Sequence, residues 1–255
     1  MHTPLEQFQI IPIFPIKLLH VDLSFSNLFL MNAITLLFFI KIVHFFSSKK
    51  NYLNKISFFL IPNSWQVFIE SVYDTVSQLL FDNVNLKGQK YLPYISMIFL
   101  FILLSNLSGL IPYTFTVTSH IIITFSLSFS IFIGINIICV KKHGFNILSL
   151  IIPANSAFTV ALILVPIEFI SYLAKPISLG VRLFINLMAG HTLLKVILGF
   201  SWSILLLENS IFLAHLVPLL ILVILMFLEL AVAFIQAYVF TILICIYLND
   251  GVNLH

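Results

Sequence analysis

The chain has 255 residues, of which 61% are hydrophobic and only 8% are charged, with a formal net charge of +3. A soluble domain needs a mixed, charged surface, so this composition excludes one and indicates a polytopic membrane protein. The lysines stand in short clusters between apolar runs, which is typical of topology signals rather than of a nucleic-acid surface. Cys139 and Cys245 lie far apart in apolar runs, so we expect neither a disulfide nor a metal site.

The N-terminal segment, residues 1–22, lacks the features of a cleaved targeting sequence, so we expect the chain to reach its membrane without an imported presequence. An apolar run follows at 23–46, which is long enough for the roughly 20 helical residues that span a bilayer. Lys49, Lys50 and Lys55 come next. Because such clusters favour the cytoplasmic or matrix side, they place this loop inside and the N-terminus outside.

Residues 63–86 have the pattern of an amphipathic helix rather than of a spanning one. Apolar side chains recur at helical spacing at Trp65, Phe68, Val72, Val76, Leu79 and Leu80, and polar ones lie among them at Glu70, Asp74, Ser77 and Asp82. This charge density makes spanning costly, so we expect the helix to lie on the inner surface of the membrane. A partner protein that covers the apolar stripe is the alternative.

Residues 91–140 predict a transmembrane hairpin of two apolar helices joined by a short uncharged turn. Basic clusters at 87–90 and 141–143 precede and follow the hairpin, and both fall on the same side as the earlier lysine cluster. Asn106 and His120 lie near the outer turn. Capping or interfacial hydration is one interpretation of these two residues, and the lining of a water-filled cavity is another.

The remaining stretch, residues 153–249, predicts two long helices with one clear break near residues 208–210. Helices of roughly 40 to 50 residues would measure about 60–75 Å, against a hydrocarbon core of about 30 Å. Strong tilt, or kinks at the prolines at 166, 176 and 218, would reconcile the two lengths. The chain is therefore predicted to be an all-α polytopic membrane protein that forms a single membrane domain.

Arg182 lies deep inside the apolar stretch from Leu173 to His191. An arginine at mid-bilayer depth costs about 2.5–3.5 kcal/mol on insertion scales, so a partner carboxylate or a water-filled cavity has to receive it. A functional role is therefore the default interpretation of Arg182.

Further polar residues recur at fixed spacing on the two long helices. A separation of seven residues, nearly two helical turns, links Glu168 to Lys175 and Arg182, Glu208 to His215, and Glu229 to Gln236. Each set lies along one helix face, so we expect two facing polar stripes, whereas His191, nine residues after Arg182, looks toward a different environment. A row of short side chains runs through Ala174, Ser178, Asn186 and Gly190. Packing within the subunit explains this row, or close approach to a separate, moving partner.

Two long motifs resemble subunit a of the F-type ATP synthase, the stator part of its proton channel. The segment SLGVRLFINLMAGH resembles the essential-arginine helix of that family, and LELAVAFIQAYVFTILICIYLNDG resembles its last helix. The earlier SNLSGLIPYTFTVT is similar to the turn after the second transmembrane span. The PLEQFQIIPI opening and the YLND ending resemble mitochondrially encoded versions from plants, algae or protists.

The resemblance implies roles for individual residues. Arg182 matches the essential arginine, Asn186 the asparagine one turn later, Glu168 the acid upstream, and Gln236 the glutamine that faces the arginine. In bacterial members an acid commonly follows the AG of the motif and a histidine occupies the last helix. Here His191 and Glu229 stand the other way round, as in mitochondrial members, which implies that they are neighbours in one half-channel. The secondary candidates are His215, Glu208, Lys175 and Ser178, although snorkelling or a loop position also explains the charged ones.

The implied function is the passage of protons to and from a carboxylate on a rotating ring of c subunits, through two offset half-channels, coupled to ATP synthesis. The implied partners are the c ring, peripheral-stalk and other membrane subunits of the complex, and membrane lipids. The implied location is the mitochondrial inner membrane, with the chain encoded in the mitochondrial genome. The sequence has no phosphate-binding glycine loop, nucleophile or metal constellation, so we expect no cofactor and no catalysis in this chain.

Two other classes of membrane protein also place charges inside apolar helices. A secondary transporter or antiporter-like subunit would do so in broken helices, but it predicts internal repeats that the sequence does not show. A haem-bearing respiratory subunit needs well placed histidine pairs, and only His191 and His215 lie well inside long helical runs.

Overall fold

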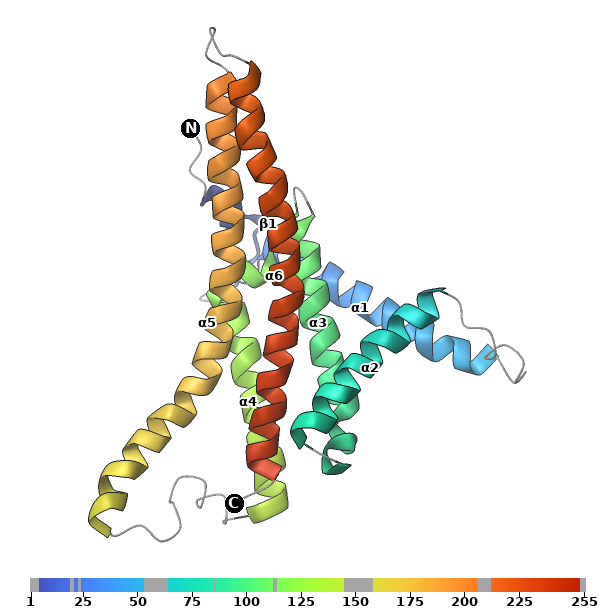
Figure 1. The fold of residues 1–255 in the computed structure, drawn as a ribbon, viewed down its shortest axis with the longest axis vertical. Helices are drawn as coiled ribbons and strands as arrows, with labels where there is room; N and C mark the ends of the chain where they lie inside the picture. The colour runs from blue at the N-terminus through green and yellow to red at the C-terminus, as the bar shows by residue number, and fades with distance from the viewer. Residues whose placement is uncertain are drawn as a thin grey trace. The chain divides into compact units, whose positions relative to one another are not determined.

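Helices make up most of the chain in its computed structural model (Figure 1). The structure describes residues 5–18, 21–22, 24–52, 64–84, 86–111, 114–144, 158–205 and 212–252. Within these ranges, four stretches are long and apolar enough to cross a membrane, namely Gly88–Leu110, Ile121–His143, Ile163–Leu205 and Leu216–Gly251. The prediction of an all-α polytopic membrane protein is confirmed.

The described α-helices are α1 Asn27–Tyr52, α2 Ser64–Val84, α3 Leu92–Leu110, α4 Ile121–His143, α5 Phe158–Leu205 and α6 Phe212–Val252. Short 3-10 helices lie at η1 Glu6–Phe8, η3 Leu86–Tyr91 and η4 Val117–Ser119. α5 runs through Pro166 and Pro176, and α6 runs through Pro218, without ending at any of these prolines. With 48 and 41 residues they are about 72 Å and about 62 Å long, so each exceeds the apolar thickness of a bilayer.

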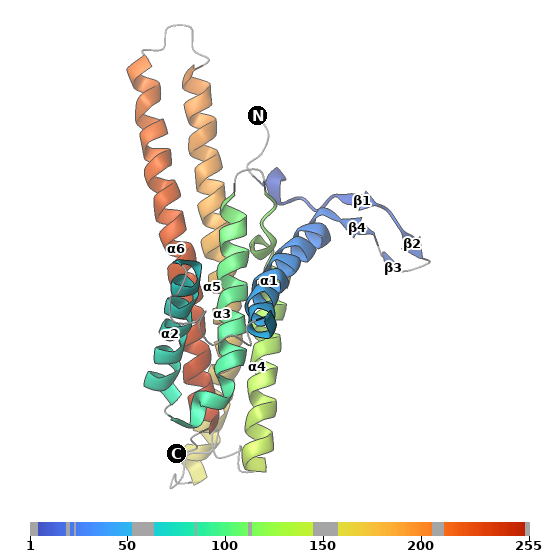
Figure 2. The same cartoon turned by 90° about the vertical axis from the view of Figure 1, so that its right-hand side faces the viewer.

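The N-terminal segment forms short strands that were not predicted. β1 Pro12–Phe14 pairs antiparallel with β4 Phe25–Ser26, and β2 Lys17–Leu18 pairs with β3 Val21–Asp22. The two pairs follow one another as a narrow ribbon that leads into α1 (Figure 2). The hydroxyl of Ser26 accepts a hydrogen bond from the backbone N–H of Phe29 at 3.4 Å, so it acts as the N-cap of α1.

α1 covers the region of the first expected span. Its apolar part is Asn27–Lys41, and the side chains beyond residue 41 lie outside the described ones, as do those of Lys49, Lys50 and Lys55. The span at 23–46 and the placement of this loop on the inner side therefore stay predictions.

The chain divides into two compact units, and each is described by itself. Unit 1 contains Met1–Lys41, Phe101–Ile123 and Arg182–Ala237, and unit 2 contains Ile42–Leu100, Thr124–Val181 and Tyr238–His255. In unit 1, the second part of α5 and the first part of α6 lie side by side (Figures 1 and 2). The ring of Phe39 on α1 meets that of Phe101 on α3 edge to face, with 6.3 Å between the ring centroids.

Unit 2 buries the apolar stripe of α2 in part. The buried side chains of α2 are Val76, Leu79, Leu80 and Val84, which recur at the spacing of one helix face. Elsewhere in unit 2, α4 buries Ile131, Ile135 and Cys139, and α6 buries Phe240, Ile244 and Leu248. The chain itself thus covers this end of the stripe, while the side chains of Trp65 and Phe68 lie outside the described ones.

Candidate functional site

Arg182 lies on the outward side of α5, in unit 1. Leu183 and Leu187 are buried on the inner side of the helix, whereas Arg182, Ile185 and Ala189 are exposed. The guanidinium makes no hydrogen bond and no ion pair with any residue that the structure describes. A fixed positive charge in the apolar stretch Ile163–Leu205 therefore faces away from the described part of its own chain.

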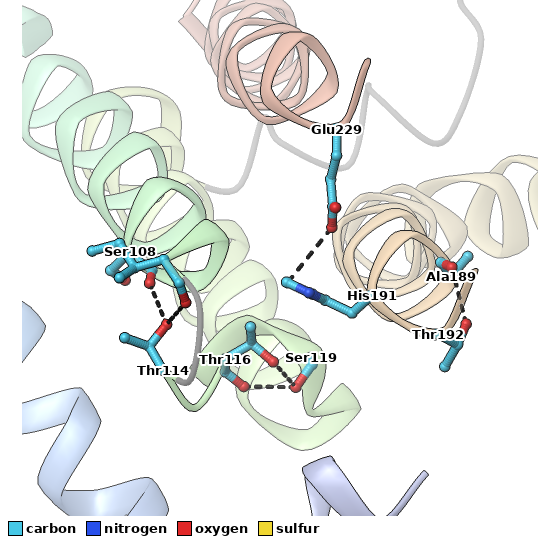
Figure 3. A network of polar contacts seen from close by, with 9 residues as sticks. Ser108, Thr114, Thr116, Ser119, Ala189, His191, Thr192 and Glu229 are labelled. Carbon is cyan, nitrogen blue, oxygen red and sulfur yellow. Dashed lines mark hydrogen bonds and ion pairs between the residues drawn. The ribbon is translucent and has the colours of Figure 1, made fainter. Parts of the chain in front are cut away.

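His191 on α5 and Glu229 on α6 point toward each other in unit 1 (Figure 3). The Nε2 atom of His191 lies 3.6 Å from Oε1 of Glu229, and the two side chains are only 16% and 6% exposed. Among the described residues, neither Nε2 nor either carboxylate oxygen has a hydrogen-bond partner. Since 3.6 Å is too long for a direct hydrogen bond, the acid and the imidazole face each other without bonding directly.

A pair of amides lies beside this acid and imidazole. The side-chain nitrogen of Asn186 donates a hydrogen bond to Oε1 of Gln236 at 2.8 Å, and Gln236 is buried. Asn186 precedes His191 by five residues on α5, and Gln236 follows Glu229 by seven on α6. Unit 1 therefore brings polar residues of the two long helices together at two neighbouring levels.

Asn106 adds a polar side chain from a third helix, α3. It is 1% exposed, and its side-chain nitrogen donates to the carbonyl of Ala233 at 3.4 Å. Ala233 comes one turn after Glu229 on α6. The Oδ1 atom of Asn106 is buried without a partner among the described residues. Asn106 is therefore packed inside unit 1, and both interpretations of its role stay predictions.

Hydroxyl groups from the segment between α3 and α4 lie in the same region (Figure 3). The hydroxyl of Thr116 donates to that of Ser119 at 2.6 Å, and the hydroxyl of Ser119 donates to the carbonyl of Thr116 at 2.6 Å. Thr114 donates to the carbonyl of Ser108 at 2.7 Å. Polar groups of this segment therefore border the part of unit 1 that holds His191 and Glu229.

Gly190 makes room for the carboxylate of Glu229. A Cβ atom at position 190 would lie 2.8 Å from Oε1 and 3.1 Å from the carboxylate carbon of Glu229. Such a contact is too short without a shift of the acid. Of the row of short side chains, Gly190 thus serves packing inside the subunit, while Ala174 and Ser178 are exposed and can face a separate partner.

Unit 2 contains an ion pair that the sequence reasoning missed. The Nζ atom of Lys175 on α5 lies 3.1 Å from Oδ2 of Asp250 on α6. Lys175 also lies over the rings of Tyr172 and Tyr247, at 5.7 Å and 5.0 Å from the ring centroids. The hydroxyl of Tyr172 donates to Oδ1 of Asn136 on α4. Lys175 is the sequence feature that could have indicated Asp250, because a lysine in an apolar helix needs a carboxylate partner.

The other candidates are not brought together. Glu168 is half-buried on α5 in unit 2 and makes no hydrogen bond or ion pair with described residues. Glu208 lies outside the described residues, and His215 is on α6 but its side chain is outside the described ones. No group of three or more histidine, cysteine, aspartate or glutamate side chains that could hold a metal ion occurs in the described part of the chain.

Known proteins match nearly the whole chain. The family model described as ATP synthase A chain matches residues 28–249. ATP synthase subunit a of Chondrus crispus is 46% identical, with 99% of this chain and 97% of the relative covered. ATP synthase subunit a of Pylaiella littoralis is 47% identical with 100% and 99% covered, and that of Brassica napus is 47% identical with 99% and 97% covered. The chain belongs to the ATP synthase subunit a family.

Proposed function

We propose that the chain is the proton-conducting stator subunit of the ATP synthase membrane sector, which exchanges protons with a carboxylate on a rotating ring of c subunits. The observation that carries this proposal is the exposed guanidinium of Arg182 in an apolar helix, without a partner in the described part of the chain. A charge so costly to place in a bilayer needs a counter-charge, and a carboxylate on a separate subunit supplies one.

Arg182 has two tasks in this mechanism. It favours the ionised form of each ring carboxylate that passes, because an opposite charge at short range stabilises the charged state. Arginine is suited to this task, since it stays protonated and offers a planar fork to the carboxylate. A fixed positive charge also repels protons, so Arg182 separates the two half-channels and prevents a leak between them.

The pair of His191 and Glu229 relays protons on one side of Arg182. A proton that arrives through water is accepted by the carboxylate or the imidazole and is then passed on to a ring carboxylate, which becomes neutral. At a separation of 3.6 Å, Nε2 and Oε1 can both hydrogen-bond to one water molecule that lies beside them rather than between them. Asn106 supports the relay, since its buried carbonyl oxygen can accept a hydrogen bond from such water.

Asn186 and Gln236 form a neutral wall beside the relay. The two amides share a 2.8 Å hydrogen bond. Because amide side chains do not ionise near neutral pH, neither takes a proton and neither neutralises the guanidinium. Arg182 therefore stays available to the ring. Glu168, which precedes Arg182 on α5, acts as the acid of the second half-channel.

The proposal extends to the surroundings of the chain. Its partners are the c ring, on the exposed side of α5 that holds Arg182, together with peripheral-stalk and other membrane subunits. The location is the mitochondrial inner membrane. The chain translocates protons and is not itself catalytic, so ATP is formed elsewhere in the complex.

Substitution of Arg182 tests the proposal. In vesicles that contain the assembled complex, Arg182→Ala should abolish ATP synthesis driven by a proton gradient, because no fixed charge then meets the ring carboxylate. Arg182→Lys should restore little, since a desolvated lysine can lose its proton and lacks the planar fork. Ile185→Ala, on the same exposed side of α5, is the matched control and should retain synthesis. Near-normal synthesis with Arg182→Ala would refute the assigned role.

A further inference from the structure

The N-terminal ribbon is held to the start of α1 by one side chain. Oδ1 of Asn27 accepts hydrogen bonds from the backbone N–H groups of Ile11 at 3.2 Å and Leu28 at 2.8 Å. Its side-chain nitrogen donates to the carbonyl of Gln9 at 3.1 Å. The backbone N–H of Asn27 also donates to the carbonyl of Ile11 at 3.2 Å. Asn27 therefore ties the ribbon to the first turn of α1.

The ribbon exposes a continuous run of apolar side chains. Every residue from 9 to 16 is exposed, and after Gln9 all of them are apolar. Phe14 is 63% and Ile11 58% exposed. A two-stranded ribbon is at best marginally stable in water, and this one has no apolar core of its own among the described residues. Its exposed surface needs a cover.

The backbone of the ribbon is suited to an apolar environment that offers few hydrogen-bond partners. Both strands of a two-stranded ribbon are edge strands, and their free N–H groups would be left unsatisfied against an apolar phase. Pro12 and Pro15 carry no N–H, so they remove two of these donors. The same prolines prevent the outer edge of β1 from adding a further strand of a partner protein over this stretch.

The apolar surface of the ribbon continues onto α1. The rings of Phe14 and Phe25 lie 6.5 Å apart, and those of Phe25 and Phe29 lie 5.1 Å apart, so an aromatic series runs from β1 to the first turn of the helix. Further along α1, large apolar side chains are exposed at Ile34, Leu36, Leu37, Phe38 and Ile40. In a membrane protein such a helix surface faces lipid, and the ribbon extends it without a break.

We propose that the N-terminal ribbon is an interfacial lipid anchor, which lies in the headgroup and upper acyl region of the bilayer at the N-terminal end of α1. Ribbon residues 10–16 contain no charge and few hydrogen-bond donors. This composition suits contact with lipid, because lipid chains form no directional hydrogen bonds. In the sequence, the charged residues Glu6, Lys17 and Asp22 flank this uncharged stretch. The anchor would fix the depth and direction of α1.

Fluorescent labelling of the assembled complex tests this proposal. In a background with Cys139→Ala and Cys245→Ala, single cysteines at Ile11 and Phe14 would carry an environment-sensitive fluorophore, and Lys141→Cys, at an exposed lysine, serves as the water-facing control. The complex would be placed in phosphatidylcholine vesicles with and without lipids brominated near the headgroup. We expect blue-shifted emission at both ribbon positions, strong quenching by the brominated lipid and weak quenching by aqueous iodide, with the reverse at the control.

Two results would overturn the proposal. Quenching of the ribbon probes by iodide alone would place the ribbon in water. Protection from both quenchers would mean that another subunit of the complex covers it. The measurement reads no proton flux, so its outcome is independent of the role proposed for Arg182.

Discussion

Lys175 on α5 and Asp250 on α6 form an ion pair with 3.1 Å between Nζ and Oδ2, although 75 residues separate them in the chain. The lysine lies over two tyrosine rings, those of Tyr172 and Tyr247, so the pair is surrounded by aromatic groups rather than by further charges. It joins the last turns of α6 to α5 in unit 2.

A double-mutant cycle on this pair should show a small but real coupling. The side chains are 29% and 44% exposed, so Lys175→Gln and Asp250→Asn should couple by about 0.5–1 kcal/mol of unfolding free energy. Equilibrium unfolding of the chain in mixed detergent micelles measures it. The control cycle combines Asp250→Asn with Lys141→Gln, on another helix. Coupling no larger than that of the control would contradict the ion pair.

A double variant that exchanges His191 and Glu229 should pump protons faster than the single variant Glu229→His. His191→Glu with Glu229→His restores one acid and one imidazole to positions that are 3.6 Å apart, so proton pumping in vesicles should exceed that of Glu229→His alone. His191→Ala should cost less than Glu229→Ala, because water can bridge the gap that the imidazole leaves. The losses of proton pumping in the single exchanges His191→Glu and Glu229→His are compared with the loss in the double exchange. If the two single losses simply add, the residues do not share a pathway.

Gly190→Ala should impair proton pumping through Glu229. The new Cβ atom would lie 2.8 Å from Oε1, so the carboxylate has to leave its position 3.6 Å from Nε2 of His191. Gly199→Ala on the same helix is the matched control, because a Cβ atom there meets nothing within 4 Å and alanine favours the helix. Proton-pumping rates of the two variants, at equal amounts of assembled complex, decide the matter. Equal rates would show that Gly190 does not position the acid.

Gly251→Ala should destabilise unit 2, and a second substitution should correct it. A Cβ atom at position 251 would collide with Sγ of Cys139 and would lie 3.4 Å from its Cβ. Overpacking of this kind costs about 1–3 kcal/mol of unfolding free energy. Cys139→Ala removes the sulfur and leaves an ordinary contact, so the double variant should regain stability in the same micelle assay. Failure of the double variant to recover would point to another cause for the loss.

The helical parts of the fold could be predicted because they depend on local properties. Apolar length and lysine clusters pointed to spanning helices, and helical spacing separated α2 from them. The ribbon before α1 could not be predicted in this way. Its strands are short, and they depend on Asn27 reaching back to Gln9 and Ile11, a contact that no local propensity encodes.

The site was predictable in its residues but less so in its contacts. Arg182 stood out because the cost of a charge in an apolar helix is local. The closeness of His191 to Glu229 was implied by the family resemblance and not by spacing, which only set His191 apart from Arg182. Asp250 was missed because its partner lies on another helix, and the contact of Asn106 with the carbonyl of Ala233 also joins two helices.

The sequence by itself determined that this chain is a helical membrane protein, which of its segments are helices, and that Arg182 needs a partner. Only the tertiary structure decided that Asn186 meets Gln236, that Nε2 of His191 lies 3.6 Å from Oε1 of Glu229 and that the guanidinium turns outward. The physical reason is that helical periodicity assigns residues to a face, whereas the rotation and register of one helix against another come from packing. A shift of one residue turns a side chain by about 100° and would break every one of these contacts.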